Sequence, residues 1–144
     1  MPDIFHQFPI KASAEKIFEA VSTPKGLDNW WTKTSKGKPQ LGEQYELFFS
    51  PEYVWTAIIS QCIPNKAFEF TMQQSDDDWT NTKVGFMLTE KNNNTTEVNF
   101  YHTGWPHNNA HYQISSYCWA MYLRIVKRYL EFGETVAYEK RLSV

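Results

Sequence analysis

Residues 109–133 read NAHYQISSYCWAMYLRIVKRYLEFG, and this stretch decides which fold the chain can form. It holds no proline and no internal glycine. Asn109 can cap the start of a helix, and Gly133 favours the left-handed conformation that ends one. The stretch therefore predicts one long helix from about Asn109 to Phe132, which the rest of the chain has to cover.

Placing successive residues 100° apart gives this helix a narrow polar side and a wide apolar side. The polar side holds Gln113, Ser116, Arg124, Lys127, Arg128 and Glu131. The apolar side holds Ile114, Cys118, Trp119, Met121, Tyr122, Leu123, Ile125, Val126, Tyr129 and Leu130. This arc is roughly 200° wide, about twice the stripe that an ordinary surface helix buries. We therefore expect a curved sheet to wrap the helix, with short helices beside it.

Five segments before the helix have the composition of strands. They lie at about 43–49, 53–63, 66–73, 81–90 and 95–103, with turn residues between them. Alternation is clear in three of them, and the series expected to face inward are Phe68, Phe70 and Met72, then Val84, Phe86 and Leu88, then Thr96, Val98, Phe100 and His102. Such alternation is typical of an antiparallel sheet with one covered face and one face in water.

The N-terminal part of the chain predicts one further strand and two short helices. Residues 4–10 (IFHQFPI) have the composition of a strand. Ser13 can cap a helix over residues 14–22, and Thr23 followed by Pro24 is a start signal for a second one. This second helix should carry three apolar side chains onto the core: Leu27, Trp30 and Trp31.

The chain has 144 residues and a formal net charge of −2, and its length fits one hydrophobic core. No repeat or low-complexity segment divides it. The predicted order is a strand, two short helices, a run of antiparallel strands and a long C-terminal helix, which is an α+β fold. We place a single domain at residues 1–133 and a C-terminal tail at residues 134–144.

Composition excludes several classes of function. Nucleic-acid binding needs a basic patch, whereas Lys33, Lys36 and Lys38 form only a short cluster in a predicted loop. No apolar run approaches the roughly 20 residues that span a bilayer, and the N-terminus lacks the pattern of a signal peptide. Cys62 and Cys118 are isolated, which fits a reducing compartment. We expect a cytoplasmic protein that binds no nucleic acid and has no membrane span.

Four segments together resemble one known family. They are IKASAEKIFEA (10–20), TPKGL leading to WW (23–31), HTGW (102–105) and WAMYLRIVKRYLEFG (119–133). In this order and spacing they resemble the activator of heat-shock protein 90 ATPase homologue-like family, within the START/Bet v 1-like (SRPBCC) superfamily. The resemblance covers nearly the whole chain, and it departs from the family pattern at residues 106–111 and after Gly133.

The resemblance implies the helix-grip fold, in which a strongly curved antiparallel sheet grips the long C-terminal helix. Proteins of this superfamily often keep a cavity between sheet and helix for an apolar or amphipathic ligand. They also include co-chaperone domains, lipid carriers and cyclase-like enzymes. The resemblance therefore implies binding and carries no fixed set of catalytic residues.

Aromatic residues make up 17% of the chain, and they can line a cavity or fill it. We predict a ligand cavity lined by Trp31, Phe70, Phe86, Phe100, His102, Trp105, Trp119, Tyr122 and Leu123. Trp31, Trp105 and Tyr122 should lie near its opening, where the loop at Trp105 and Pro106 is a candidate flap. A core closed completely by aromatic side chains is the alternative.

His102 has two interpretations, because strand alternation turns it toward the interior. It is either a core histidine that bonds to Tyr122 or Ser116, or a group that holds the polar end of a ligand together with Tyr122. Both interpretations require a hydrogen-bond partner, since a buried imidazole without one would be costly.

Three histidines raise the question of a metal site, namely His102, His107 and His111. His107 falls in a predicted loop, and no acidic residue lies between Thr103 and Tyr117 to complete a ligand set. Asp76, Asp77 and Asp78 have the pattern of a solvated hairpin. We therefore expect neither a metal nor another cofactor.

The function we predict is binding of a small hydrophobic or amphipathic molecule, since the motifs of common hydrolases and nucleotide-binding enzymes are absent. Two alternatives stay open. One is a module that contacts a chaperone ATPase of the heat-shock protein 90 type, and the other is a cyclase- or hydrolase-like enzyme that uses His102 with Tyr122. A homodimer through a sheet edge or through the tail residues Val136, Tyr138 and Leu142 also stays open.

Overall fold

The computed structural model describes residues 1–144. The chain begins with β1 (Ile4–Ile10), α1 (Ala14–Ser22) and α2 (Pro24–Leu27). The strands that follow are β2 (Thr34–Lys36), β3 (Gln44–Ser50), β4 (Tyr53–Ile63), β5 (Ala67–Gln74), β6 (Lys83–Asn92) and β7 (Thr95–Thr103). The chain ends with α3 (Ala110–Phe132) and the 3-10 helix η1 (Tyr138–Ser143).

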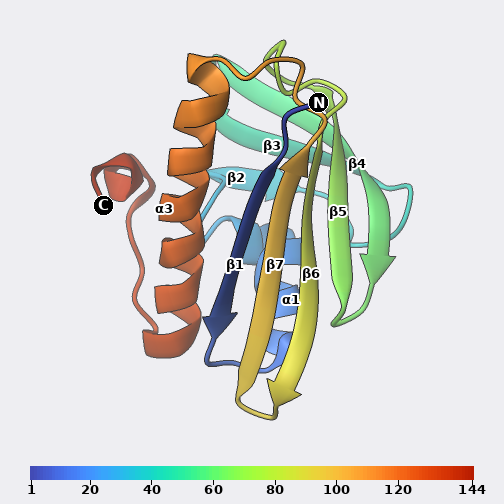
Figure 1. Ribbon diagram of the computed structural model, residues 1–144. Helices are drawn as coiled ribbons and strands as arrows, with labels where there is room; N and C mark the ends of the chain where they lie inside the picture. Colours follow the sequence, from blue (N-terminus) through green and yellow to red (C-terminus); the bar gives the residue numbers. More distant parts are fainter.

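All seven strands form one antiparallel sheet in the order β1-β7-β6-β5-β4-β3-β2. The first strand pairs with the last, and Ile4 lies opposite His102. Register shifts in β4, at Thr56/Ala57 and Ile59/Gln61, are bulges that bend the strand. The sheet curves, with α3 alongside β1 and α1 on the side of β5 and β6 (Figure 1). The predicted α+β helix-grip fold is therefore confirmed.

Both ends of α3 carry the predicted caps. Oδ1 of Asn109 accepts the backbone N–H of Tyr112 at 3.0 Å. Gly133 has a φ of 70°, and its N–H donates to the carbonyl of Tyr129. The prediction of one helix between Asn109 and Gly133 is confirmed. None of the helices combines the length and the apolar character that crossing a membrane requires.

The two short helices also begin at the predicted caps, Ser13 and Thr23. They lie close together because Gly26 has no side chain. A Cβ atom at this position would lie 2.4 Å from the carbonyl oxygen of Glu19. Trp30 reaches the core as predicted, where its Nε1–H donates to the carbonyl of Ala20 at 2.9 Å.

Aromatic side chains fill most of the space between the sheet and the helices. Phe68, Phe70, Phe86 and Phe100 are almost fully buried. The ring centroids of Phe86 and Phe100 are 5.2 Å apart, and those of Phe68 and Phe70 are 5.0 Å apart in an edge-to-face arrangement. Much of the interior is thus a closed aromatic core of the kind that the sequence left as an alternative.

The apolar side of α3 is covered only in part. Trp119, Leu123, Ile125 and Val126 are buried. Ile114 is 60% exposed, so the expectation that the whole wide arc would be wrapped is wrong for the N-terminal part of the helix. The sheet does not close over this part, and Ile114 lies at the edge of a pocket described below.

β2 is an element that sequence reasoning missed. It has three residues, Thr34–Lys36, and it pairs with β3 so that Lys36 lies opposite Glu46. Lys36 therefore lies on a strand and not in the loop predicted for it. A three-residue polar strand shows too little alternation to be recognised from sequence.

The C-terminal tail predicted at residues 134–144 folds against α3 through η1. Arg141 is 5% exposed and anchors this segment. Its guanidinium donates to the carbonyl oxygens of Val136 at 3.1 Å, Thr32 at 3.1 Å and Asp28 at 2.8 Å. The tail is therefore bonded to the connection that follows α2.

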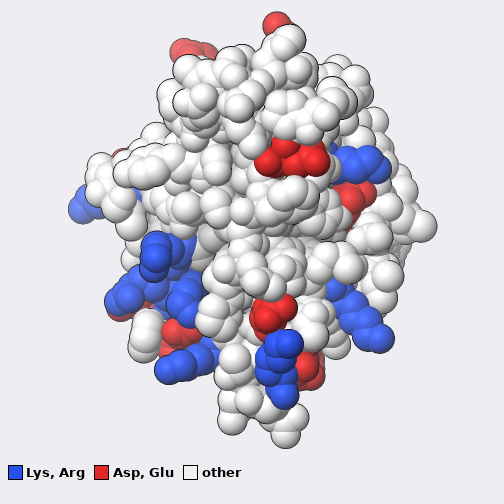
Figure 2. All heavy atoms as spheres, in the orientation of Figure 1, with Lys and Arg blue, Asp and Glu red and all other residues white.

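Basic side chains are confined to one half of α3. They are Arg124, Lys127 and Arg128, which all lie in its C-terminal half. Figure 2 shows lysine and arginine atoms gathered over the lower half of α3 as drawn in Figure 1. The N-terminal half of α3 carries no lysine or arginine, and this half borders the candidate site.

Candidate ligand-binding site

A cavity of about 470 Å³ opens where the N-terminal half of α3, the β3–β4 hairpin, the β5–β6 connection and the tail meet. We call it the aromatic pocket. It is lined by Trp31, Phe49, Tyr53, Trp55, Asp76, Trp79, His111, Ile114, Ser115, Cys118, Trp119, Tyr122, Tyr138 and Leu142. Eleven of these residues are hydrophobic, so the walls of the pocket are mainly apolar.

Five lining side chains contact one another in a closed series, which we call the aromatic cycle. Successive ring centroids are separated by 5.5 Å (Trp31–Phe49), 4.9 Å (Phe49–Trp55), 5.0 Å (Trp55–Trp79), 5.7 Å (Trp79–Trp119) and 5.2 Å (Trp119–Trp31). Trp31, Trp79 and Trp119 are buried, which fixes their orientation. The cycle is therefore a preformed aromatic surface.

More exposed side chains surround this surface. Tyr53 is 51% exposed, Ile114 60% and Leu142 72%. Leu142 and Tyr138 come from η1, so one wall of the pocket belongs to the tail that Arg141 anchors. The pocket thus lies outside the closed core and is open to solvent on this side.

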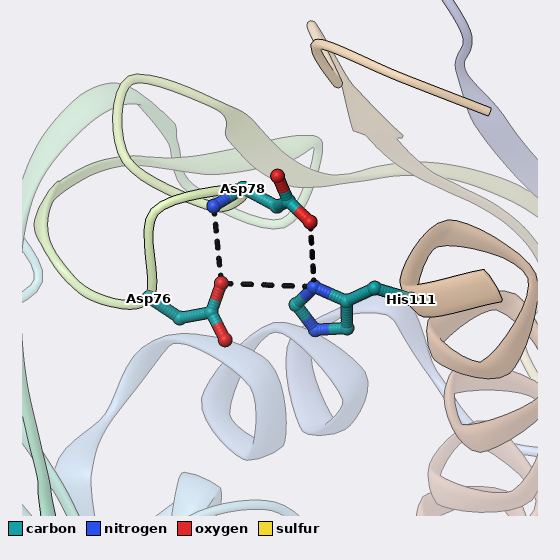
Figure 3. Close-up of side chains that lie close together, drawn as sticks. All are labelled: Asp76, Asp78 and His111. Atoms are coloured by element: carbon teal, nitrogen blue, oxygen red, sulfur yellow. Dashed lines mark hydrogen bonds and ion pairs between the residues drawn. The ribbon is translucent and has the colours of Figure 1, made fainter. Parts of the chain in front are cut away.

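Two carboxylates face one imidazole at the pocket (Figure 3). Nδ1 of His111, in the first turn of α3, lies 2.9 Å from Oδ2 of Asp78 and 3.6 Å from Oδ1 of Asp76. Oδ1 of Asp76 also accepts the backbone N–H of Asp78 at 3.0 Å. Hydrogen bonds from His111 and Asn109 hold the pKa of Asp78 below its usual range. The cluster ties the β5–β6 connection to the start of α3.

The prediction of a solvated hairpin is therefore wrong for Asp76 and Asp78, which are partly buried. Their carboxylate oxygens and Nδ1 of His111 all lie within 4.8 Å of one another, and these atom types can ligate Zn²⁺ or Mn²⁺. An ion bound to all three would break the hydrogen bond between His111 and Asp78. The contacts within the cluster account for its geometry without an ion.

The three histidines considered above as metal ligands do not lie together in one site. His102 is fully buried in the core, whereas His107 is exposed in the loop before α3. His111 alone lies at the pocket.

Polar atoms at the pocket can hold the polar end of a ligand. Nε1 of Trp79 is buried and has no hydrogen-bond partner in the protein. Burial beside Tyr138 and Cys118 raises the pKa of Tyr122 to about 12, so its hydroxyl keeps its proton at neutral pH. The carboxylate of Asp76 is an acceptor. The pocket thus offers a phenol donor and a carboxylate acceptor, whereas the indole N–H of Trp79 is buried.

His102 lies in the core and not at the pocket. Its Nδ1 accepts the Nε1–H of Trp119 at 3.0 Å, and its Nε2 lies 2.8 Å from Oγ1 of Thr82. Because the hydroxyl of Thr82 donates to the carbonyl of Trp79, it accepts the proton of Nε2. The imidazole is therefore the neutral tautomer protonated at Nε2. Burial lowers the pKa of His102 to about 3.

The partners predicted for His102 are wrong. Oγ of Ser116 faces His6, whose Nε2 is 3.5 Å away, and Tyr122 lines the aromatic pocket. An acid–base pair of His102 and Tyr122 is thus absent from this site. Both ring nitrogens of His102 are used in the core, which agrees with its interpretation as a structural residue.

The structure places only three of the nine predicted lining residues at the aromatic pocket: Trp31, Trp119 and Tyr122. Phe70, Phe86, Phe100, His102 and Trp105 are buried in the core. Leu123 lines a separate groove of about 380 Å³ between β1 and α3. Trp105 was expected near the opening, but it is fully buried and packs against His102 at 4.8 Å between ring centroids.

Sequence reasoning missed the other lining residues because they come from segments far apart in the chain. Phe49 and Trp55 come from the β3–β4 hairpin and Tyr138 from η1, and these segments share no sequence motif. Trp79 offered one signal. It follows three aspartates in a polar turn, where a large apolar side chain needs a packing surface.

Comparison with a family model agrees with the fold. The model described as "Activator of Hsp90 ATPase homolog 1-like protein" matches residues 11–131. A comparison with curated proteins gave no match.

Solved structures have the same fold over nearly their whole length. The solution structure of the Aha1 dimer from Colwellia psychrerythraea is 29% identical, with a TM-score of 0.82 over 93% of this chain and 99% of that chain. The crystal structure of SSP2350 from Staphylococcus saprophyticus is 20% identical, with a TM-score of 0.78 over 94% and 96%. MLL2253 from Mesorhizobium loti is 18% identical, with a TM-score of 0.80 over 92% and 99%. The last two likenesses concern the fold alone.

The family model spans most of the chain, and the helix-grip sheet, the caps of α3 and the buried Trp30 agree with the motifs that predicted it. The chain belongs to the family of activator of Hsp90 ATPase homolog 1-like proteins.

Proposed function

We propose that this protein binds a small hydrophobic or amphipathic molecule in the aromatic pocket. The observation that carries the proposal is the aromatic cycle beside a cavity of about 470 Å³. Small-molecule sites are typically cavities of about 300–1,000 Å³ with apolar walls and a few polar groups. Tyr122 and Asp76 are the polar groups that would orient such a ligand.

Burial of the ligand's apolar surface supplies the free energy of binding, at about 25 cal/mol per Å² removed from water. The rings of the aromatic cycle are already held by their contacts with one another and with the core. Phe70 lies 6.1 Å from Trp31 and Phe100 lies 4.7 Å from Trp119, measured between ring centroids. Binding therefore costs little side-chain entropy on the side of the protein.

Indole N–H resonances offer a direct test, because the six tryptophans divide into two groups. Trp31, Trp55, Trp79 and Trp119 line the pocket, whereas Trp30 and Trp105 do not. The neutral probe tryptophol has about 12 non-hydrogen atoms, which gives about 3.6 kcal/mol of binding at about 0.3 kcal/mol per atom, or a Kd of about 2 mM. In ¹⁵N-labelled protein, tryptophol should shift the four pocket resonances more than the other two.

Two tyrosines on α3 form a matched pair for this test. Tyr122 lines the pocket, whereas Tyr117 is 78% exposed and does not line it. Tyr122→Ala should weaken tryptophol binding at least about threefold, and Tyr117→Ala should leave it unchanged. Native mass spectrometry of the freshly purified protein would reveal a tightly held cellular ligand as added mass. Unchanged pocket resonances at several millimolar tryptophol would overturn the proposal.

A second candidate function is contact with an ATPase of the Hsp90 type, and the family match favours it. Such a contact would use the outer surface of the domain, because the aromatic pocket is too small for a protein partner. The test is the ATPase rate of an Hsp90 protein with and without this chain. Stimulation that survives Tyr122→Ala would support a surface contact, and an unchanged rate would count against it.

Self-association is a further proposal, since the related structure from Colwellia psychrerythraea is described as a dimer. The exposed tail side chains Leu142 and Val144 are candidate contacts. Light scattering after size-exclusion chromatography gives the mass directly, and a monomer mass at the highest soluble concentration would exclude a stable dimer.

A further inference from the structure

The charged side chains that line the aromatic pocket are mainly acidic. No lysine or arginine lines it, and the ionisable groups that do include Asp76 and His111. Asp78 faces His111 from the same connection as Asp76, so two carboxylates share one imidazole. The cluster stays negative even when His111 carries a proton. A ligand that ends in a carboxylate would meet no lysine or arginine among the lining residues and would face Asp76.

One buried cation belongs to the tail that lines the pocket, and its contacts turn it away from this role. The guanidinium of Arg141 lies over the ring of Tyr138, 5.4 Å from the ring centroid. It also donates to three backbone carbonyls, those of Val136, Thr32 and Asp28. Each of its three nitrogens donates to one of these carbonyls, and Arg141 is not a lining residue.

The aromatic cycle adds a second attraction for positive charge. Tryptophan faces carry the negative side of the ring quadrupole, and a cation within about 6 Å of the centroid is attracted to them. Phe49 joins Trp31 to Trp55, and Trp55 in turn contacts Trp79, at centroid distances of 4.9–5.5 Å. An ammonium group near Asp76 would thus meet a carboxylate and electron-rich rings in the same pocket.

We propose that the ligand of the aromatic pocket is an amphipathic amine or quaternary ammonium compound, whose cationic end lies at Asp76 and whose apolar body lies on the aromatic cycle. This inference rests on the proposed function and names the class of ligand for the same site. Asp76 is suited to this contact because its side chain is 34% exposed and is held in place by the backbone N–H of Asp78.

Three probes with the same indole ring and different end groups test the inference: tryptamine, tryptophol and indole-3-acetate. At pH 7 they carry a positive charge, no charge and a negative charge. The Kd of each is read from the pocket indole resonances described above. We expect tryptamine to bind at least about fivefold more tightly than tryptophol, and indole-3-acetate to bind most weakly.

Asp76 is the residue tested, and the neighbouring Asp77 supplies the matched control. Asp76→Asn removes the charge but keeps an oxygen that can accept the N–H of Asp78. It should reduce the preference for tryptamine over tryptophol at least about threefold. Asp77 is exposed and does not line the pocket, and Asp77→Asn changes the net charge by the same amount. This variant should keep the preference of the wild type, and thermal melting checks that both variants are folded.

The outcomes separate this inference from the proposed function. Equal affinities for tryptamine and tryptophol, tighter binding of indole-3-acetate, or a preference that Asp76→Asn leaves intact would overturn the inference and leave the pocket as a binding site for neutral molecules. Absence of binding by all three probes would overturn the proposed function and this inference with it. A preference for tryptamine that only Asp76→Asn reduces would support both.

Discussion

The indole of Trp119 donates its Nε1–H to Nδ1 of His102 across 3.0 Å, and this bond joins the long helix to the last strand inside the core. Trp119 also lines the aromatic pocket, so one side chain takes part in both the core and the candidate site. The bond requires an unprotonated Nδ1. The protonation state of His102 is therefore linked to the stability of the fold.

Stability should fall with acid because of His102. Burial lowers its pKa to about 3 in the folded protein, whereas an unfolded histidine titrates near 6.5. The unfolded state gains a proton first, so this contribution is complete above pH 6.5 and is lost as the pH falls from 6.5 toward 3. The shifted pKa of His102 should make the free energy of unfolding about 2 kcal/mol lower at pH 5 than at pH 8.

Urea unfolding of the wild type and His102→Gln at pH 8 and pH 5 measures this contribution. The variant should be less stable at pH 8, and its loss between the two pH values should be smaller by about 2 kcal/mol. An equal loss in both proteins would show that His102 does not titrate as described.

Removing either of two buried threonine hydroxyls should affect the stability of the fold differently. Oγ1 of Thr82 bonds to His102 and to the carbonyl of Trp79, whereas Oγ1 of Thr56 is buried without a partner. Thr82→Val should lower the free energy of unfolding by about 1–3 kcal/mol, because it leaves partners unsatisfied. Thr56→Val should be neutral or stabilising. Chemical unfolding of both variants tests the pair, and similar losses in the two would contradict the assigned hydrogen bonds.

The tail should depend on Arg141 for its attachment. Arg141→Met removes hydrogen bonds to three carbonyls and should lower the free energy of unfolding by about 2–3 kcal/mol. Lys140 is exposed, and Lys140→Met should change stability by less than about 0.5 kcal/mol. Hydrogen exchange is the more specific measurement, since amides of residues 138–143 should lose protection in Arg141→Met alone.

Cysteine reactivity should report on occupancy of the pocket. Cys118 lines the pocket, whereas Sγ of Cys62 donates to the carbonyl of Pro39 elsewhere. Burial raises the pKa of both thiols, so both should react with N-ethylmaleimide more slowly than free cysteine at pH 7. Tryptophol should slow the reaction of Cys118 and leave that of Cys62 unchanged. Mass spectrometry after digestion gives both rates, and equal protection of the two would exclude a specific effect.

Local signals in the sequence identified every element except β2 and η1, whereas the helix-grip arrangement was implied by the family resemblance. The caps Ser13, Thr23 and Asn109 and the terminating Gly133 all lie where the helices begin or end. Alternation in β5, β6 and β7 identified the buried face correctly. These features depend on a few neighbouring residues, which is why sequence reasoning could find them.

The pocket could not be predicted in the same way, because its position depends on where packing leaves space. Strand alternation turns Phe70, Phe86 and Phe100 inward, but it does not tell whether they line a cavity or fill it. They fill it, and the free volume lies beyond Trp31 and Trp119. The partners of His102 were missed for a related reason, since Thr82 lies in a connection whose path the sequence pattern does not define.

One wall of the aromatic pocket is a short terminal segment, whereas the other walls are parts of the sheet and of α3. The family match ends at residue 131, before this segment begins. Substitutions at Tyr138 or Leu142 can therefore reshape the cavity without disturbing the core that forms the fold. Under the proposed function, a change of ligand therefore needs no new scaffold, because substitutions in this segment are enough to alter what fits.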